Sequence, residues 1–475
     1  MIAIIAGRLA QFLLALAMIR VATTLLSPEE MGKVSLTLTS IAFFAMFLIN
    51  PVGMFINRRL HAWQASGMAK PYLIRYAGYL LLVAFIAAIN LSMLQMSGLI
   101  SFGISTSWLI ILACGSIIFN TINQTAIPSL NMLGYSGRFI FLTVATVAAS
   151  FVCAVSLLQA FQPAAEYWLL GLLLGQTLLA VIGVRVLFAR LQKVVDQRSP
   201  EINRRHIRIL FNFGWPVAVA AGLAWVQSQG YRYFMEDQLG LAQLGLFVAG
   251  YGISAGMIAG FESILTSYFQ PRLYRDVSGG HANEQAEAWH RYATAVIPSL
   301  ILTTALIAML APELTRLFLG VRYQAAADLV IWGVIAEAAR VLAGVYSLIA
   351  HVNMKTYWLI IPNTIGAAFS VVLCLLFIPI AGAAGVGMGL AISGFASVLA
   401  MHILLIRNVG GGISLRPVFM AIISAILLWG VALEGRQLFN ISGWSGLVGM
   451  LAMVGSMYLA MQYWLLWRHL EEKRE

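Results

Sequence analysis

The sequence contains few charged side chains. Only 10% of its 475 residues are Asp, Glu, Lys or Arg, whereas about a quarter of the residues in soluble domains are charged. Hydrophobic residues make up 61% of the chain, and the mean hydropathy is +0.87. A chain this apolar has too few polar side chains to cover a globule in water. The composition therefore excludes an ordinary soluble domain and predicts a multi-pass membrane protein.

Cysteine is also scarce. Cys114, Cys153 and Cys374 lie far apart in sequence, each inside an apolar run. This spacing excludes a disulfide framework and a cysteine-based metal site. No alternating strand pattern recurs along the chain. Because backbone polar groups in lipid need internal partners, we expect the apolar runs to be helices.

Apolar runs near or above the length of a bilayer crossing recur along the whole chain, and only the thirteenth is short. They predict an all-α polytopic membrane protein with about 14 transmembrane helices. The expected spans lie at roughly 2–26, 34–57, 74–96, 107–128, 138–160, 167–190, 209–233, 240–268, 290–311, 325–351, 356–379, 383–406, 417–434 and 445–467.

Most of the 29 lysines and arginines fall in the loops of one side when the N-terminus is placed inside. The positive-inside rule then predicts that both termini are cytoplasmic. The net charge of +11 is explained by this topology and by anionic lipid headgroups, so no nucleic acid partner is expected. The first span lacks a basic flank and a cleavage site, so we expect a retained helix rather than a signal peptide. A start upstream of Met1 is the alternative.

The longest polar stretch, residues 189–210, separates six spans from eight. Short internal matches relate the two parts: residues 25–36 resemble 238–249, and residues 148–158 resemble 367–377. The first match places a glycine, Gly32 or Gly245, at the opening of the next helix. An even number of spans separates the repeats, which predicts two pseudo-symmetric six-helix bundles. The predicted parts are an N-terminal bundle (1–195), a C-terminal bundle (196–408), and two additional helices with a cytoplasmic tail (409–475).

Three stretches together resemble a known family. They are "FNFGWPVAVAAGLAWVQSQGYRYFMEDQLGLAQLGLFVAGYGIS" (211–254), "PELTRLFLGVRYQAAADLV" (312–330) and "FIPIAGAAGVGMGLAIS" (377–393). In this order they resemble the Wzx-like polysaccharide transporters of the multidrug/oligosaccharidyl-lipid/polysaccharide flippase superfamily. The chain departs from the family at Thr23 and Thr24, where Ala-Arg is common, and at Tyr231, where Asp often precedes the arginine. It also lacks the acidic residue of helix one that many cation-coupled drug extruders carry.

The resemblance implies a central cavity between the bundles and a lipid-linked cargo. The cargo would be a polyprenyl-diphosphate-linked oligosaccharide, moved from the cytoplasmic to the outer leaflet of a bacterial inner membrane for O-antigen, capsule or exopolysaccharide synthesis. Membrane lipids, a glycan polymerase and a chain-length regulator are the implied partners. No bound cofactor is expected, and a proton or sodium gradient is the candidate energy source.

Other functions remain open at this point. A drug or metabolite antiporter and a lipid II flippase belong to the same superfamily. A membrane glycan polymerase or glycosyltransferase would use the same cargo, but the predicted outer loops are short and carry no paired carboxylates. A channel or structural protein is a further alternative. We therefore expect a transporter rather than an enzyme.

Arginines inside the spans are candidates for binding a diphosphate, since a guanidinium offers two parallel donors and stays charged. The candidates are Arg8 and Arg20 in the first span, Arg232 at the outer end of the seventh, and Arg340 in the tenth. The structural alternative for the first two is snorkelling or pairing with an acid at a helix end. For Arg232, the alternative is an interfacial arginine with Glu236 and Asp237 nearby.

Glu337 and Arg340 lie three residues apart within one span, so they share a helix face and can pair. Each ionised group at a membrane midplane costs about 2.5–3.5 kcal/mol on insertion scales, and a buried pair is rarely a net stabiliser. We therefore expect the two side chains to line an aqueous cavity, with an internal structural pair as the alternative. Glu262, in the eighth span, is a candidate for titration in a coupling cycle or for a simple interfacial position.

Amide side chains follow one stripe of the fourth span at helical spacing. They can donate to and accept from sugar hydroxyls, or hold helices together, and the sequence favours neither. The glycan-contact candidates are Asn120, Asn123, Gln124 and Asn131.

Overall fold

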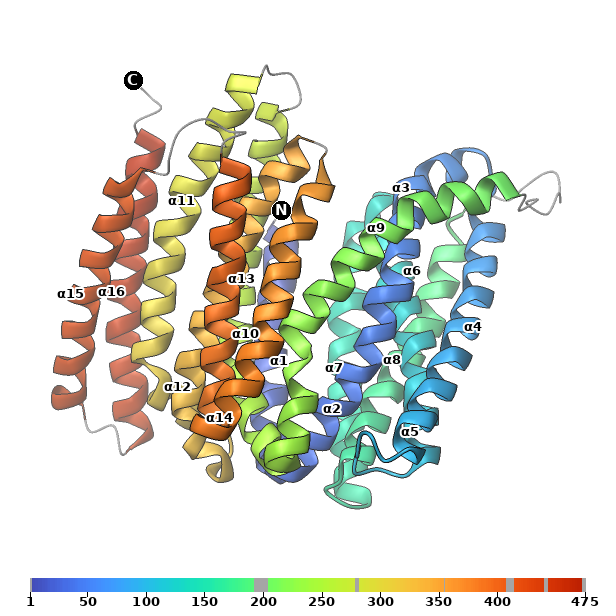
Figure 1. Cartoon of the computed structure of the whole chain (residues 1–475), viewed down its shortest axis with the longest axis horizontal. Helices are drawn as coiled ribbons and strands as arrows, with labels where there is room; N and C mark the ends of the chain where they lie inside the picture. The colour runs from blue at the N-terminus through green and yellow to red at the C-terminus, as the bar shows by residue number, and fades with distance from the viewer. Residues whose placement is uncertain are drawn as a thin grey trace. The chain divides into compact units, whose positions relative to one another are not determined.

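The computed structural model describes residues 2–191, 204–277, 282–353, 355–406, 414–439 and 443–471. Helices make up nearly all of these ranges, and no strand occurs within them (Figure 1). By their contacts the residues form two compact units, Met1–Val248 (unit 1) and Ala249–Glu475 (unit 2). The predicted bundle boundaries at 195/196 and 408/409 lie outside the described residues, so the division into bundles stays a prediction.

Unit 1 consists of helices joined by short connections. Its elements are α1 (Ile2–Leu25), α2 (Pro28–Phe44), the π-helical turn η1 (Ala45–Ile49), α3 (Asn50–Ala65), α4 (Ala69–Met96), α5 (Thr106–Gly115), the π-helical turn η2 (Ser116–Asn120), α6 (Thr121–Met132), α7 (Ser136–Ala160), α8 (Ala165–Phe188), α9 (Arg204–Gln229) and the first part of α10 (Tyr231–Val277).

Unit 2 begins at Ala249, within α10. Its remaining elements are α11 (Ala282–Met309), α12 (Ala311–Phe318), the 3₁₀ turn η3 (Val321–Ala326), α13 (Ala327–Val352), the 3₁₀ turn η4 (Thr356–Leu359), α14 (Ile360–Leu405), α15 (Leu415–Leu438) and α16 (Trp444–Glu471).

The predicted membrane helices are confirmed. Eleven helical segments of the described residues are long and apolar enough to cross a membrane, and a shorter apolar helix covers 9–25. Two of the eleven, residues 208–270 and 357–405, each contain two of the predicted spans. Large apolar side chains such as Leu81, Phe85 and Ile380 are exposed on these helices, as lipid-facing residues are. The chain is therefore a multi-pass membrane protein.

Glycines produce the internal breaks of the two long segments. Gly240 (φ 81°, ψ 168°) interrupts α10, and Gly382 (φ 56°, ψ −134°) interrupts α14. Residues with a Cβ rarely adopt such dihedral angles. Pro379 precedes the second break and lacks the N–H that a continuous helix would use. Each break allows one span to end and the next to begin with almost no loop.

Small residues allow close packing in unit 1. The helices α7 and α8 lie side by side (Figure 1), and a Cβ on Gly171 or Gly175 would lie 2.3 Å from the Cα of Ala154 or Ser150. In lipid, helix association depends on such close packing rather than on hydrophobic burial. At the start of α2, the hydroxyl of Ser27 accepts from the Glu30 N–H at 3.3 Å and Pro28 fills the first turn, which fixes where this helix begins.

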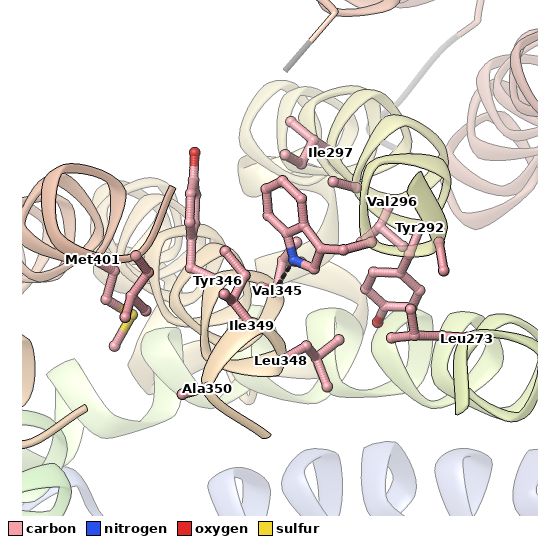
Figure 2. Packing of buried hydrophobic residues seen from close by; sticks show 14 of the residues in the cluster. Leu273, Tyr292, Val296, Ile297, Val345, Tyr346, Leu348, Ile349, Ala350 and Met401 are labelled. Atoms are coloured by element: carbon pink, nitrogen blue, oxygen red, sulfur yellow. Dashed lines mark hydrogen bonds between the residues drawn. The ribbon is translucent and has the colours of Figure 1, made fainter. Parts of the chain in front are cut away.

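The core of unit 2 lies where α10, α11, α13 and α14 meet. Trp289 is almost fully buried, and its indole N–H donates to the Val345 carbonyl at 3.0 Å. Tyr292 and Leu273 belong to the same cluster of buried side chains and lie next to each other (Figure 2). Because the indole donor is satisfied, this large side chain can be buried without an electrostatic penalty.

The C-terminal helices α15 and α16 are built into unit 2. Arg436 donates to both carboxylate oxygens of Glu313, at 2.7 and 3.0 Å, and to the Met309 carbonyl. Glu313 is only 3% exposed. On α16, the amide of Gln462 donates to the Ser299 carbonyl at 2.9 Å and to Thr303. These buried polar contacts attach both helices to α11 and α12, so they form part of the bundle rather than a loose appendage.

Candidate functional site

Three ionisable side chains of unit 2 meet around one guanidinium. Arg340 on α13 donates from Nε to Glu337 at 2.7 Å and from Nη2 to Glu262 of α10 at 2.8 Å. Glu337 also accepts from the Tyr251 hydroxyl at 2.5 Å. The expected Glu337–Arg340 pair is therefore present, and Glu262 extends it to a triad. We call Glu262, Glu337 and Arg340 the carboxylate triad, and Tyr251 is hydrogen-bonded to it.

Exposure differs within the carboxylate triad. The Glu337 side chain is 8% exposed, that of Glu262 is 30% exposed and that of Arg340 is 45% exposed. Glu337 is thus the inner anchor, while Arg340 and Glu262 present one open face. One cation and two carboxylates give the triad a net negative charge when all are ionised. By Coulomb's law, this excess attracts a cation and repels an anion.

A cavity of about 250 Å³ adjoins the triad within unit 2. Its polar wall consists of Glu262, Thr266, Gln270, Tyr292, Ser347 and His351. Glu262 belongs both to this wall and to the triad. Glu337 and Arg340 themselves do not line this cavity, so the expectation that the pair lines an aqueous cavity stays a prediction.

Arg232 in unit 1 has a different environment. Its Nη1 lies within hydrogen-bond distance of Thr39 Oγ1 and Gln229 Oε1, and its Nε donates to the Tyr231 hydroxyl at 3.2 Å. These partners are neutral. Among the described residues no carboxylate forms an ion pair with Arg232, although Glu236 and Asp237 follow it in sequence. The half-buried guanidinium thus has no carboxylate counterion among the described residues, which suits an anionic ligand.

The residues around Arg232 join α2 to the α9–α10 elbow. The Trp225 indole donates to the Thr39 carbonyl at 3.3 Å, and Ser40 and Tyr233 share a hydrogen bond of 2.6 Å. The Trp225 ring lies 5.0 Å from that of Phe43, edge to face. Arg232 is thus held in a network of hydroxyl and aromatic groups.

The two candidate arginines of the first predicted span, Arg8 and Arg20, both lie on α1. Arg20 is half-buried on α1, and its carbonyl accepts from the Thr24 hydroxyl at 2.7 Å. Arg8 lies on the same helix, but its side chain lies outside the described part of the structure. Their contact with a diphosphate stays a prediction.

The amide candidates separate into different settings. Asn123 is buried and donates to the Gln176 carbonyl of α8 at 2.8 Å, which is the helix-joining alternative. Gln124 is exposed and donates to Asn120 at 3.3 Å, and Asn131 accepts from Ser136 at the end of α6. Asn120, Gln124 and Asn131 are not buried, so the structure leaves room for their predicted contact with a sugar, which stays a prediction.

Sequence reasoning missed several partners. Tyr251 lies eleven residues before Glu262, which is three helical turns, so the periodicity of α10 could have placed both on one face. Thr39 gave no such signal, because it lies 193 residues from Arg232 in the sequence. Gln229 lies three residues before Arg232, but an uncharged amide at that position does not by itself indicate a contact. Only the three-dimensional arrangement brings them to the guanidinium.

Comparison with known proteins identifies the fold. No protein-family model and no curated protein matches the sequence. Among solved structures, the lipid II flippase MurJ in an inward closed conformation matches with a TM-score of 0.64 and 14% identity, covering 99% of this chain and 98% of that one. Transporters of the multidrug resistance MATE family match in inward-facing and outward-facing conformations, with TM-scores of 0.62 and 0.61 and 16% identity. These cover 84% and 86% of this chain and 94% and 95% of theirs. The chain therefore has the fold of these MOP superfamily transporters, with two pseudo-symmetric bundles.

Proposed function

We propose that this protein is a flippase that moves a polyprenyl-diphosphate-linked oligosaccharide between the leaflets of a bacterial inner membrane. The observation that carries the proposal is the Arg232 guanidinium, which has hydrogen-bond partners but, among the residues that the structure describes, no carboxylate in an ion pair with it. A diphosphate supplies the missing negative charge through charge-assisted hydrogen bonds. Arg8 and Arg20 are proposed to assist at the same headgroup, and Asn120 and Gln124 to contact the glycan.

The likeness to a lipid II flippase along the whole chain supports a lipid-linked cargo. The multidrug transporters cover less of the chain. Within this proposal, the alternative cargo is lipid II. The glycan polymerase and chain-length regulator remain proposed partners.

The carboxylate triad is proposed to carry the coupling ion. Its negative excess would repel a diphosphate but accept a proton or sodium ion, and Glu262 opens to the adjoining cavity. Arg340, which the sequence assigned to the diphosphate, would then act by bridging Glu262 and Glu337 and offsetting their mutual repulsion. Tyr251 would orient Glu337 through its hydrogen bond.

Binding of farnesyl diphosphate to the purified protein tests the proposal, with farnesol as the uncharged probe. We expect farnesyl diphosphate, but not farnesol, to raise the apparent melting temperature. Arg232→Gln should abolish this shift, whereas Arg322→Gln, at an exposed arginine, should retain it. Equal shifts with both probes, or an unchanged shift in Arg232→Gln, would contradict a diphosphate site at Arg232.

A further inference from the structure

Three cations of unit 1 lie against two aromatic rings at one end of its helices. The guanidinium carbons of Arg138 and Arg190 lie 5.6 and 5.4 Å from the centroid of the Tyr135 ring, and Lys70 Nζ lies 5.5 Å from that of Phe188. These residues come from the start of α4, the α6–α7 connection with the start of α7, and the end of α8 with the residues after it. We call these five residues the basic corner.

The turn that ends α6 fixes the position of Tyr135. The Gly134 N–H donates to the Asn131 carbonyl at 3.0 Å, and the Tyr135 N–H donates to the Leu130 carbonyl at 2.8 Å. Gly134 has a φ of 88°, so these two bonds form the glycine motif that commonly ends helices. The ring that both arginines face therefore belongs to a defined, hydrogen-bonded turn.

The basic corner has no carboxylate counterion within the described residues. The sequence contains no Asp or Glu between Glu30 and Glu166, and Glu166 lies in the first turn of α8, at the opposite end of this helix from Phe188. No ion pair in the described ranges includes a residue of the basic corner. By contrast, the cation of Arg291 in unit 2 pairs with Glu287 at 3.2 Å. Like charges gathered in this way attract an anion.

The basic corner lies where membrane spans end. The segments Ala69–Met96, Ser136–Ala160 and Ala165–Phe188 are long and apolar enough to cross a membrane, so their ends lie near the lipid headgroups. Aromatic rings also favour this level. A positive-inside bias requires cations in the loops, but it does not require cations from three chain segments to converge on two rings. Basic pockets between membrane helices bind anionic lipid headgroups.

We propose that the basic corner is a binding site for the headgroup of an anionic bilayer phospholipid. The exposed guanidiniums of Arg138 and Arg190 bind the phosphate through charge-assisted hydrogen bonds, and Lys70 adds a point charge. Ile74, one turn after Lys70, and Phe141, one turn after Arg138, are 53% and 71% exposed, so an acyl chain can lie along either helix. This lipid is a resident of the bilayer rather than the cargo, and the site does not depend on the proposed function.

Thermal unfolding of the purified protein in detergent tests the site. Phosphatidylglycerol should raise the apparent melting temperature, whereas phosphatidylcholine with the same acyl chains and inorganic phosphate should not. Arg138→Gln with Arg190→Gln should raise the phosphatidylglycerol concentration that gives half of the shift about tenfold, because each cation near the headgroups contributes to binding. Arg272→Gln is the matched control. Arg272 is also exposed and lies 4.1 Å from the centroid of the Tyr268 ring, but no second cation lies over that ring in the described part of the chain, so the concentration should stay unchanged.

A charge-conserving variant separates lost binding from lost folding. Arg138→Lys with Arg190→Lys keeps both charges and should retain most of the phosphatidylglycerol shift, and added salt should weaken that shift. An equal shift with phosphatidylcholine or with inorganic phosphate would overturn the lipid site, and so would an unchanged shift in the double glutamine variant.

Farnesyl diphosphate distinguishes the basic corner from the proposed cargo site. The double glutamine variant should keep its response to this probe while it loses the response to phosphatidylglycerol. Loss of both responses would assign the basic corner to the cargo and overturn the lipid site. If farnesyl diphosphate does not bind the unaltered protein, the proposed function fails, while the comparison of phosphatidylglycerol with phosphatidylcholine still decides the basic corner.

Discussion

Arg340 and Arg232 are both arginines of membrane helices, yet their neighbours give them opposite electrostatic settings. Arg340 lies between two carboxylates, and Arg232 lies among neutral oxygens. The sequence predicted the first pairing through the spacing of Glu337 and Arg340. It could not predict Glu262 as the third member, because 78 residues separate Glu262 from Arg340. At Arg232 the structure shows neutral hydrogen-bond partners, and among the described residues Glu236 and Asp237 form no ion pair with it.

At this scale, removal of Arg340 should destabilise the protein because it leaves the buried Glu337 facing Glu262 unpaired. Breaking a fully buried pair costs about 3–5 kcal/mol, and we expect about 2–3 kcal/mol here since the Arg340 side chain is 45% exposed. Arg340→Gln should therefore lower the apparent melting temperature. Adding Glu337→Gln should recover most of the loss. Arg291→Gln, which removes an exposed pair with Glu287, should cost under about 1 kcal/mol and serves as the control.

The observed helices lie close to the predicted spans wherever a long apolar run was the basis of the prediction. The spans around α4, α7 and α8 were placed to within a few residues, because twenty apolar residues leave little choice in lipid. The π-helical turns η1 and η2 could not be predicted, since a single widened turn changes no hydrophobic pattern. In retrospect Pro51, directly after η1, fits such a turn because it has no N–H to continue the helical ladder. The short helix α12 was missed because its hydrophobicity resembles that of a loop.

The break in α14 gives a prediction at the scale of the element. Gly382 has φ 56° and ψ −134°, a region in which a side chain costs about 1–3 kcal/mol. A Cβ there would meet nothing within 4 Å, so any penalty is conformational rather than steric. Gly382→Ala should lower the apparent melting temperature. Gly256→Ala, in an unbroken and equally open helix position, should be neutral or stabilising by up to about 1 kcal/mol; equal stability of the two variants would contradict this explanation.

For the molecule as a whole, the length of the apolar runs and the glycines at the starts of helices sufficed to predict an all-helical membrane fold. The solved transporters share this fold. The predicted cytoplasmic location of both termini stays a prediction, because it rests on the distribution of Lys and Arg alone. The cargo could not be fixed by the sequence, since hydrogen-bonding residues such as Asn123 serve helix packing and sugar recognition equally well. The sign of the cargo's charge is the property that most clearly separates a diphosphate flippase from a cation antiporter.

Membrane voltage can therefore decide between them. Each negative charge that leaves an inside-negative compartment releases about 2.3 kcal/mol per 100 mV, so the potential should speed the outward movement of a diphosphate. Inverted membrane vesicles with the protein would carry a fluorescent polyprenyl-diphosphate sugar in their outer leaflet, which corresponds to the cytoplasmic leaflet. An inside-positive potential should accelerate its protection from an impermeant quencher. Vesicles with Arg232→Gln should show no accelerated protection. Slower protection under the same potential would mean that net positive charge moves with the cargo, as expected for export of a cation and not of a diphosphate.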